Sequence, residues 1–195
     1  MDDPFQRPSL GSAVFYKDPF AAVDWLEKAF GFERTMLITD AQGKLGHCEM
    51  TFGSGYIMLG NEWADFTASP ASTGGKNTQG IHVHLTDGID AHCERARAMG
   101  ATIQREPADE FYGDRVYRAR DPEGHVWTFA QTVRQVSRAE AEQASGLKID
   151  APRWKCPPRP STGCWPPSPS RTGAGSWRCC ASGPAGRANW RRPSA

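Results

Sequence analysis

The chain has 195 residues and a formal net charge of +1 at pH 7, a length that suits one domain of ordinary size or two small ones. No apolar run is long enough for a membrane span, and the N-terminus, MDDPFQRPSLGS, lacks the apolar core of a signal peptide, so we expect a cytoplasmic protein without a membrane partner. Every acidic residue precedes residue 153. The main part of the chain is therefore net acidic, which disfavours nucleic acid as a partner and favours neutral or cationic ligands.

The first unit, residues 8–62, is predicted to form one strand, one helix and three further strands. Asp18 is placed to cap the helix, Pro19 suits its first turn and Gly31 ends it. Its apolar residues form one stripe that we expect to be buried: Phe20, Val23, Leu26 and Phe30. The predicted strands are Leu10–Lys17, Phe32–Thr39, Leu45–Phe52 and Tyr56–Asn61, with turns at DAQG and GSG.

A turn-rich linker, residues 63–78, leads to a second unit of the same order, residues 79–131. Its helix is predicted to bury Ile89, Cys93, Ala96 and Met99 and to end at Gly100. Its predicted strands are Gly80–Thr86, Thr102–Glu106, Arg115–Arg120 and His125–Gln131, the last of them after a DPEG turn. A C-terminal extension, residues 132–152, contains the capping box Ser137–Glu140, which is expected to start a short helix.

The two units are offset copies of one pattern. The same spacing separates Asp18 from Asp87, Gly31 from Gly100, and Gly55 from Gly124. A constant offset between three structural signals indicates a duplicated module. The sequence therefore predicts an α+β fold made of paired βαβββ modules.

Residues 153–195 differ in kind from the rest. They contain no Val, Ile, Leu, Met, Phe or Tyr and no acidic residue, so they cannot bury enough apolar surface to offset the entropy of ordering. Their cysteines have no CxxC spacing, which argues against a zinc site. We expect a disordered tail, and our hypothesis is that a frameshift replaced the natural end of the chain. Cys48 and Cys93 are instead expected to be buried free thiols.

Residues 8–150 resemble the vicinal-oxygen-chelate superfamily, and most closely its bacterial glyoxalase/bleomycin-resistance-like proteins of the PhnB type. The resemblance rests on the paired modules, on AFGFE after the first helix and on YGDRVYRARDPEGHVW near the end. It implies that each module curls around a cleft with helices outside. It also implies a homodimer whose clefts lie between two chains.

Enzymes of that superfamily hold a divalent metal in the cleft with His, Glu or Gln side chains. The resemblance places the ligand positions at Gly11, at Met58 or Leu59, at Gly80 or Ile81, and at Thr128. None of these residues is a His, Glu or Gln, and a divalent ion needs three or four such ligands. We therefore expect no metal and no other cofactor.

Strand alternation predicts which side chains line the cleft instead. In the fifth strand Ile81, Val83 and Leu85 share the core face, so His82 and His84 point into the cleft. The same reasoning places His47 and Glu49 there from the third strand and Thr128 from the eighth, with Phe15 alongside. Tyr56, Trp63, Tyr112 and Arg115 complete the predicted ligand-binding set.

Each of these residues also has a simpler interpretation. His82 and His84 could chelate a metal together, or could only hydrogen-bond a ligand. His47 and Glu49 form either an acid/base pair or a solvated strand face. Tyr56, Trp63 and Tyr112 either stack on a ligand or pack at the rim of the cleft. Residues 112–115 could form a mobile loop over the cleft. Arg115 either meets the ligand or pairs with a surface carboxylate. Trp25, Trp127 and Phe129 are expected in the core, and His92 and His125 at the surface.

Two classes of function follow. The first is metal-free binding or sequestration of a small molecule, a drug or a metabolite, as the resemblance to bleomycin-resistance proteins implies. The second is a lyase, isomerase or dioxygenase of the superfamily that uses a displaced metal or none. The empty ligand positions favour binding.

Overall fold

The computed structural model describes residues 3, 7–151 and 154, and it contains the predicted order of one strand, one helix and three strands, twice. The first module comprises β1 (Gly11–Tyr16), α1 (Pro19–Phe30), β2 (Glu33–Thr39), β3 (Leu45–Phe52) and β4 (Gly55–Asn61). The second comprises β5 (Gly80–Leu85), α2 (Ile89–Ala98), β6 (Thr102–Asp109), β7 (Asp114–Arg120) and β8 (Val126–Thr132). A short 3-10 helix, η1 (Pro70–Ser72), lies in the linker, and α3 (Arg138–Ser145) follows β8. Apart from Trp154, the predicted tail at 153–195 lies outside the described residues.

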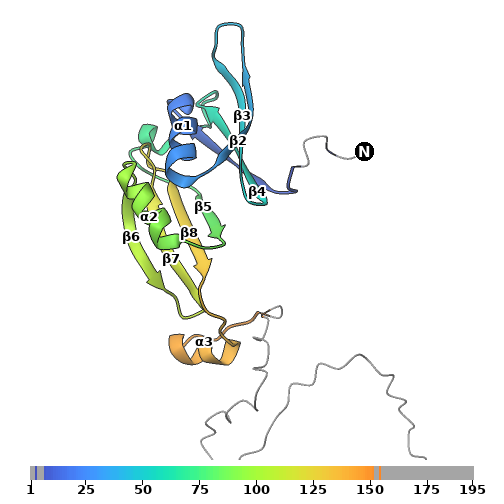
Figure 1. The fold of residues 1–195 in the computed structure, drawn as a ribbon. Helices are drawn as coiled ribbons and strands as arrows, with labels where there is room; N and C mark the ends of the chain where they lie inside the picture. The colour runs from blue at the N-terminus through green and yellow to red at the C-terminus, as the bar shows by residue number, and fades with distance from the viewer. Residues whose placement is uncertain (1–2, 4–6, 152–153, 155–195) are drawn as a thin grey trace, which may run out of the picture. The chain divides into compact units, whose positions relative to one another are not determined.

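Each module folds its strands into a four-stranded sheet of its own (Figure 1). The strand orders are β1-β4-β3-β2 and β5-β8-β7-β6. In both sheets the first strand runs parallel to the last, and all other neighbouring strands are antiparallel. The two sheets therefore share one topology, which confirms the predicted α+β fold of paired βαβββ modules.

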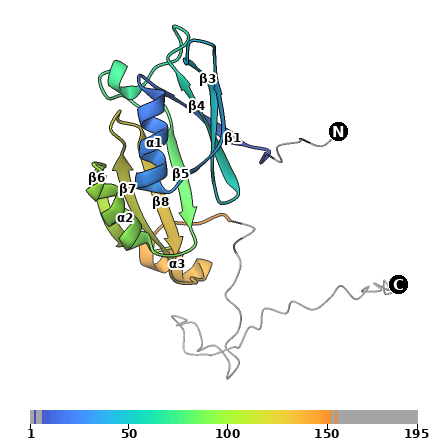
Figure 2. The same ribbon diagram turned by 45° about the horizontal axis from the view of Figure 1, so that its top comes forward.

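Helices α1 and α2 each lie against one face of their own module's sheet and contact each other (Figure 2). The core lies under the helices, because alternate residues of each strand point toward them. Its largest side chains include Tyr16, Phe30, Tyr117, Trp127 and Phe129. Cys48 and Cys93 also lie in this core, and both are free thiols, as the sequence predicts.

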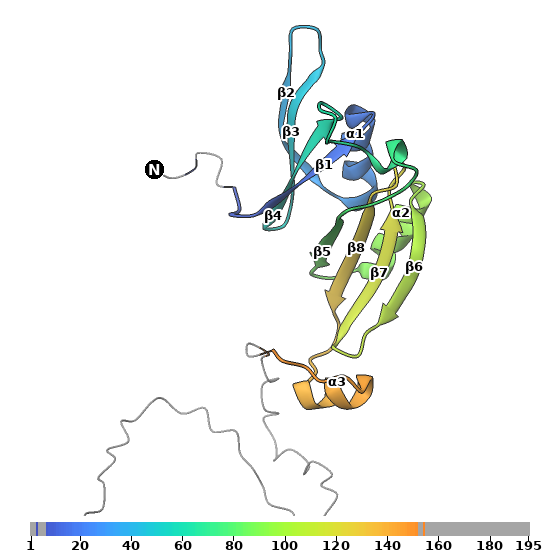
Figure 3. The same ribbon diagram turned by 180° about the vertical axis from the view of Figure 1, so that it is seen from behind.

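The opposite face of each sheet is not covered by α1 or α2, as the view from behind shows (Figure 3). We call these the open faces. The first open face carries Phe15, His47, Glu49, Tyr56 and Met58. The second carries His82, His84, Arg118, Arg120, Val126 and Thr128.

Helix α1 begins and ends where its sequence predicts. The carboxylate of Asp18 accepts a hydrogen bond from Ala21 N, and Gly31 ends the helix in the left-handed conformation. Two members of the predicted helix stripes are not buried: Phe20 is 40% exposed and Met99, which lies beyond the end of α2, is 38% exposed. In the part of the chain that the structure describes, no helix has the length and apolar character needed to cross a membrane.

The DPEG turn of the second module is built around the buried carboxylate of Asp121. Its Oδ2 accepts hydrogen bonds from Tyr16 Oη at 2.7 Å and from Trp127 Nε1 at 3.1 Å. Its Oδ1 accepts from the backbone N–H groups of Glu123 and His125, at 3.1 and 2.9 Å. One carboxylate therefore fixes the turn and joins it to a tyrosine of the first module.

The same turn reaches the first module through two further side chains. The carboxylate of Glu123 accepts hydrogen bonds from the backbone N–H groups of Lys17 and Asp18 at 2.8 and 2.9 Å, next to the start of α1. His125 Nε2 donates to the carbonyl of Phe15 at 2.8 Å. His125 is only 8% exposed, so the prediction of a surface histidine is wrong. The docking of the two modules covers it.

His92 was also predicted at the surface and is buried. Its Nε2 lies 3.0 Å from the carbonyl of Phe30, and its Nδ1 lies 2.5 Å from the hydroxyl of Tyr117. A carbonyl can only accept, so Nε2 carries the proton and Nδ1 accepts from the tyrosine. His92 thus caps the C-terminal carbonyl of α1 from the other module, where the helix lacks its own donors.

Burial of His92 should make the fold sensitive to mild acid. Burial lowers the pKa of its imidazole below the ordinary value of 6.5. The unfolded chain binds the proton near pH 6.5 but the folded chain resists it, so stability is full above that pH and falls as the pH drops toward the folded pKa. We expect the free energy of unfolding, measured by urea titration, to fall as the pH is lowered from about 7 through the ordinary pKa of histidine. The slope should be smaller in His92→Gln, and an equal slope in both proteins would contradict this role.

Candidate functional site

Two aromatic side chains on the first open face each lie next to a glycine of the neighbouring strand. A Cβ atom placed on Gly11 would overlap the ring of Tyr56, with Cζ only 2.5 Å away. A Cβ placed on Gly60 would lie 3.3 Å from Phe15 Cδ1. Register explains both contacts, because Gly11 pairs with Tyr56 and Gly60 with Phe15. Because the two glycines have no side chains, the rings of Tyr56 and Phe15 can lie close to the sheet and form a shallow aromatic surface there.

Glu49 lies beside this aromatic surface, opposite Met58 in the ladder, and it is paired rather than solvated. The guanidinium Nε of Arg7, in the segment before β1, lies 2.9 Å from both carboxylate oxygens. His47 Nε2 lies 3.0 Å from Oε1. The hydrogen bond from Arg7, together with that from His47, lowers the pKa of Glu49. Glu49 is only 5% exposed, so it does not belong to a solvated strand face.

The lowered pKa of Glu49 also bears on the predicted acid/base pair with His47. A carboxylate that is stabilised in its charged form is a weak general base near neutral pH. The arrangement therefore fits a fixed negative charge on the first open face better than a proton acceptor.

The second open face has a row of polar side chains across its middle. The register places His82 opposite Thr128, Thr128 opposite Arg118, and Arg118 opposite Arg105. The guanidinium Nε of Arg118 lies 3.4 Å from the hydroxyl of Thr128, a long hydrogen bond. Arg120 follows on the same face, opposite Val126. This face thus concentrates donors, among them three arginines, of which Arg105 is paired with Glu110.

His84 lies at one end of the second open face, away from that row. Its Nε2 is 3.2 Å from the hydroxyl of Thr132, which donates to Asp114 Oδ1 at 2.7 Å. The neighbouring Val116 and Ala130 point to the open face, yet they are 5% and 0% exposed and lie outside the core cluster under the helices. The segment after β8 lies at this end of the second sheet, since Val133 N donates to the carbonyl of Gly113.

Arg115 lies away from the open faces, and Tyr112 lies in the turn between β6 and β7. Arg115 points to the helix side, where its guanidinium donates to Asp90 of α2 and to Asp109 of β6 at 2.8 Å each. This is the surface pairing that the sequence offered as the alternative, so Arg115 is not a residue of the open face. Tyr112 is 38% exposed in the β6–β7 turn and packs edge-on against Phe111. The next residue, Gly113, is buried against the 133–136 segment, which argues against a mobile loop.

Trp63 lies at the rim of the first open face. It is 64% exposed and packs edge-on against Phe66, which is 76% exposed. Its Cδ1 lies 4.0 Å from the position of a Cβ on Gly60, close to the ring of Phe15. The tertiary structure therefore places Trp63, Phe15 and Tyr56 on or beside the open face of the first sheet.

The four positions where the resemblance implies metal ligands do not fit a divalent metal. Burial decides the register: Leu59 and Ile81 pack in or against the core, so Met58 and Gly80 are the open-face positions. At Gly11 the space of a ligand side chain is filled by the ring of Tyr56. Among the described residues, no group of three or more His, Cys, Asp or Glu side chains is placed to hold a metal ion.

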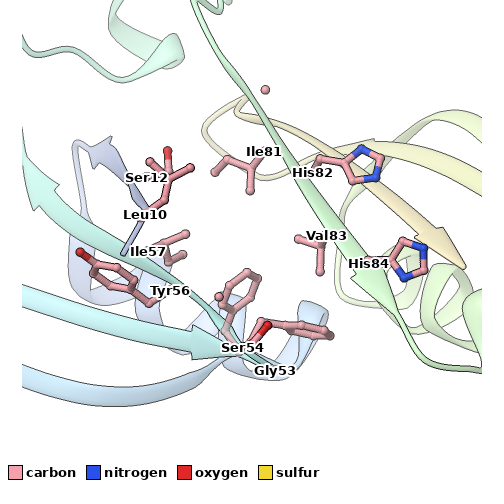
Figure 4. A pocket seen from close by; sticks show the side chains of 15 residues that line it. Leu10, Ser12, Gly53, Ser54, Tyr56, Ile57, Ile81, His82, Val83 and His84 are labelled. Carbon is pink, nitrogen blue, oxygen red and sulfur yellow. The ribbon is translucent and has the colours of Figure 1, made fainter. Parts of the chain in front are cut away.

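A cavity of about 460 Å³ lies on the side of β5 away from its histidine side chains, and Gly11 and Tyr56 of the first module also line it (Figure 4). Ile57, Ile81 and Val83 point into it, between the two modules. Of the predicted site residues, Tyr56, His82 and His84 border the cavity, but the side chains of both histidines point away from it. The histidines and this cavity therefore do not form one site.

The residue pattern does not assign Arg7, Arg118 or Arg120 to the predicted ligand-binding set. A signal for the last two was present, because the DPEG turn pairs Arg120 with Val126 and Arg118 with Thr128. Once Thr128 is placed on the open face, its antiparallel partner must lie there too. Arg7 had no such signal, since it precedes the first strand.

Comparison with known proteins agrees with this architecture. A family model described as the Glyoxalase/Bleomycin resistance protein/Dioxygenase superfamily matches residues 10–129. The uncharacterized protein Rv0887c of Mycobacterium tuberculosis is 31% identical over 148 residues, which span 74% of this chain and 86% of that protein. The crystal structure of TioX from Micromonospora sp. ML1 is 34% identical, with a TM-score of 0.53, over 64% of this chain and 98% of TioX. A superfamily member from Sphaerobacter thermophilus shares the fold at 20% identity, with a TM-score of 0.50, over 62% of this chain and 94% of its own. The chain therefore belongs to the Glyoxalase/Bleomycin resistance protein/Dioxygenase superfamily.

Proposed function

We propose that this protein binds and sequesters a small organic molecule, a drug or a metabolite, on its open faces and without a metal. The observation that carries the proposal is the pair of aromatic rings, Tyr56 and Phe15, that lie over Gly11 and Gly60. Such rings offer a planar group a large apolar contact at a small entropic cost. The residues at the four expected metal positions also support binding without a metal, because their side chains cannot supply a ligand set for a divalent ion.

We also propose that two chains associate as a homodimer. The first open face leaves Phe15, Tyr56 and Met58 partly exposed, and Trp63 and Phe66 are exposed at its rim. A second chain that covered this face would remove apolar surface from water and enclose the ligand. Light scattering should then give twice the 21.4 kDa mass of one chain.

The alternative is an enzyme of the superfamily, and the hydrogen bond between His47 and Glu49 is the observation that favours it. The two residues lie beside the aromatic surface, where a bound molecule could be reached. The lowered pKa of Glu49 weakens this alternative, because the carboxylate is already neutralised by Arg7.

Binding can be tested with planar aromatic probes such as 2-naphthamide, by saturation-transfer NMR and calorimetry in the presence of EDTA. We expect binding that EDTA does not change and that weakens about tenfold in Tyr56→Ala, because aromatic stacking contributes about 1 kcal/mol beyond area burial. Tyr112→Ala is the matched control, since Tyr112 lies in the β6–β7 turn. Stoichiometric metal in the purified protein, with turnover of a hemithioacetal or a catechol, would favour the enzyme instead.

A further inference from the structure

The second open face is cationic although the folded part of the chain is net acidic. Arg118 and Arg120 are two residues apart on β7, so both side chains leave the same face of the sheet. Their ladder partners on β8 are Thr128 and Val126, neither of which is charged. The local charge of this face is therefore opposite to the charge of the body.

These two arginines also have no carboxylate partner among the residues that the structure describes. Three other arginines of the second module pair with carboxylates: Arg97 with Glu106, Arg105 with Glu110, and Arg115 with Asp90. Arg95 of α2 donates instead to the backbone carbonyl of Ala29. Within the described part of the chain, no carboxylate lies within 4.0 Å of Arg118 or Arg120.

The guanidinium of Arg120 is partly desolvated as well as unpaired. Its Nε is buried and has no hydrogen-bond partner among the described residues. A side chain on Gly75 of the linker would approach Arg120 Nη1 to 3.9 Å, so the linker passes close to this group. A buried donor without an acceptor is unfavourable, and the arrangement gains stability when an acceptor arrives.

Acidic groups near this face are already engaged. Glu110 pairs with Arg105, and Asp114 accepts a hydrogen bond from Thr132 at the end where His84 lies. Asp114 keeps its negative charge, but neither carboxylate lies within 4.0 Å of a guanidinium nitrogen of Arg118 or Arg120, so neither forms an ion pair with them. Next to Arg118, the hydroxyl of Thr128 and, across the ladder, the imidazole of His82 add donors on the same face.

We propose that the second open face binds an anionic group of the ligand, a carboxylate, phosphate or sulfate, through Arg118 and Arg120. Planar guanidinium groups donate two parallel hydrogen bonds to such oxygens, and Thr128 and His82 complete the donor set. The inference rests on the proposed small-molecule binding and narrows it to an anionic ligand. It also replaces the expectation of a neutral or cationic ligand, because the side chains at the site outweigh the net charge of the body.

The first experiment compares the affinities of 2-naphthoate and its neutral counterpart 2-naphthamide by calorimetry. The second follows the Nε–H signals of Arg118 and Arg120 by NMR while inorganic phosphate or sulfate is added. We expect the wild-type protein to bind 2-naphthoate about tenfold or more tightly than 2-naphthamide, since a hydrogen bond between charged groups contributes that much. Arg118→Gln and Arg120→Gln should remove the preference, and Arg118→Lys should keep part of it. Arg138→Gln, the same change on the exposed α3, is the control.

The outcomes separate this inference from the proposed function. Equal affinity for both naphthalene probes, unchanged in Arg118→Gln, would overturn the anion site and leave metal-free binding intact. If phosphate or sulfate shifts the Nε–H resonances of Arg118 and Arg120 while neither naphthalene probe binds, the anion site is upheld. That result would count against the aromatic surface as a binding site. An equal loss in Arg138→Gln would reduce the preference to general surface charge and overturn the inference.

Discussion

Replacing Asp121 with alanine should lower the free energy of unfolding by about 3 to 5 kcal/mol, a large share of the stability of an ordinary domain. The carboxylate is 4% exposed and is the shared acceptor for Tyr16 Oη, Trp127 Nε1 and two backbone N–H groups. Alanine would leave these donors buried without an acceptor, and each orphaned donor costs about 1–3 kcal/mol before water or relaxation relieves it. Urea titration followed by far-ultraviolet circular dichroism measures the change.

Asp121→Asn is the matched variant, because it keeps the shape of the side chain and one carbonyl oxygen. We expect it to lose less than the alanine variant, since one oxygen can still accept from Tyr16 or from the turn. A loss below about 1 kcal/mol in Asp121→Ala would contradict the role of this carboxylate in joining the modules.

Replacing Gly113 with alanine should also destabilise the fold, by about 3 kcal/mol or more. Gly113 has φ +102°, a conformation that side chains disfavour, and a Cβ there would overlap the carbonyl oxygen of Arg134 and lie 3.0 Å from Val136 Cγ2. The carbonyl of Gly113 accepts from the N–H groups of Val133 and Arg134, both at 3.0 Å. The neighbour is backbone, so the clash cannot be relieved by turning a side chain.

Gly43→Ala separates the clash from the conformational strain. Gly43 has φ +79°, also in the left-handed region, but a Cβ there would meet nothing within 4 Å. This variant should lose only about 1 kcal/mol, the cost of the left-handed conformation alone. Comparable losses in both variants, measured by urea titration, would show that the 133–136 segment yields easily and that the contact is not tight.

Much of the fold was readable from local signals. Helix caps, helix-ending glycines and turn sequences mark the ends of helices and strands. Each of them fixes the conformation of adjacent residues, so the order of the elements could be predicted from short stretches of sequence. Alternation worked where one face is clearly apolar, as in β5, where Val83 and Leu85 are buried and His82 and His84 are exposed. The role of these histidines in ligand binding stays a prediction.

Short stretches of sequence did not predict burial where two adjacent residues are both apolar. They also did not predict it where a side chain is buried by the other module. In β7, Val116 and Tyr117 are both buried, so the apolar pattern does not show which face is which. The sequence predicts Arg115 in the ligand-binding set, whereas the pairing with β8 places Arg118 on the open face. Composition gives no location either, since net charge says nothing about where the charges gather.

The sequence by itself determined the two modules, their helices and strands, and the faces of the clearly alternating strands, because those properties depend on residues close together in the chain. Only the tertiary structure decided that His92 and His125 are buried, since each finds its carbonyl partner in the other module. It also decided that the ring of Tyr56 fills the space over Gly11 and that, among the described residues, no carboxylate pairs with Arg118 or Arg120. Those properties depend on what distant segments bring into contact, and a buried polar group is stable only where such a partner arrives.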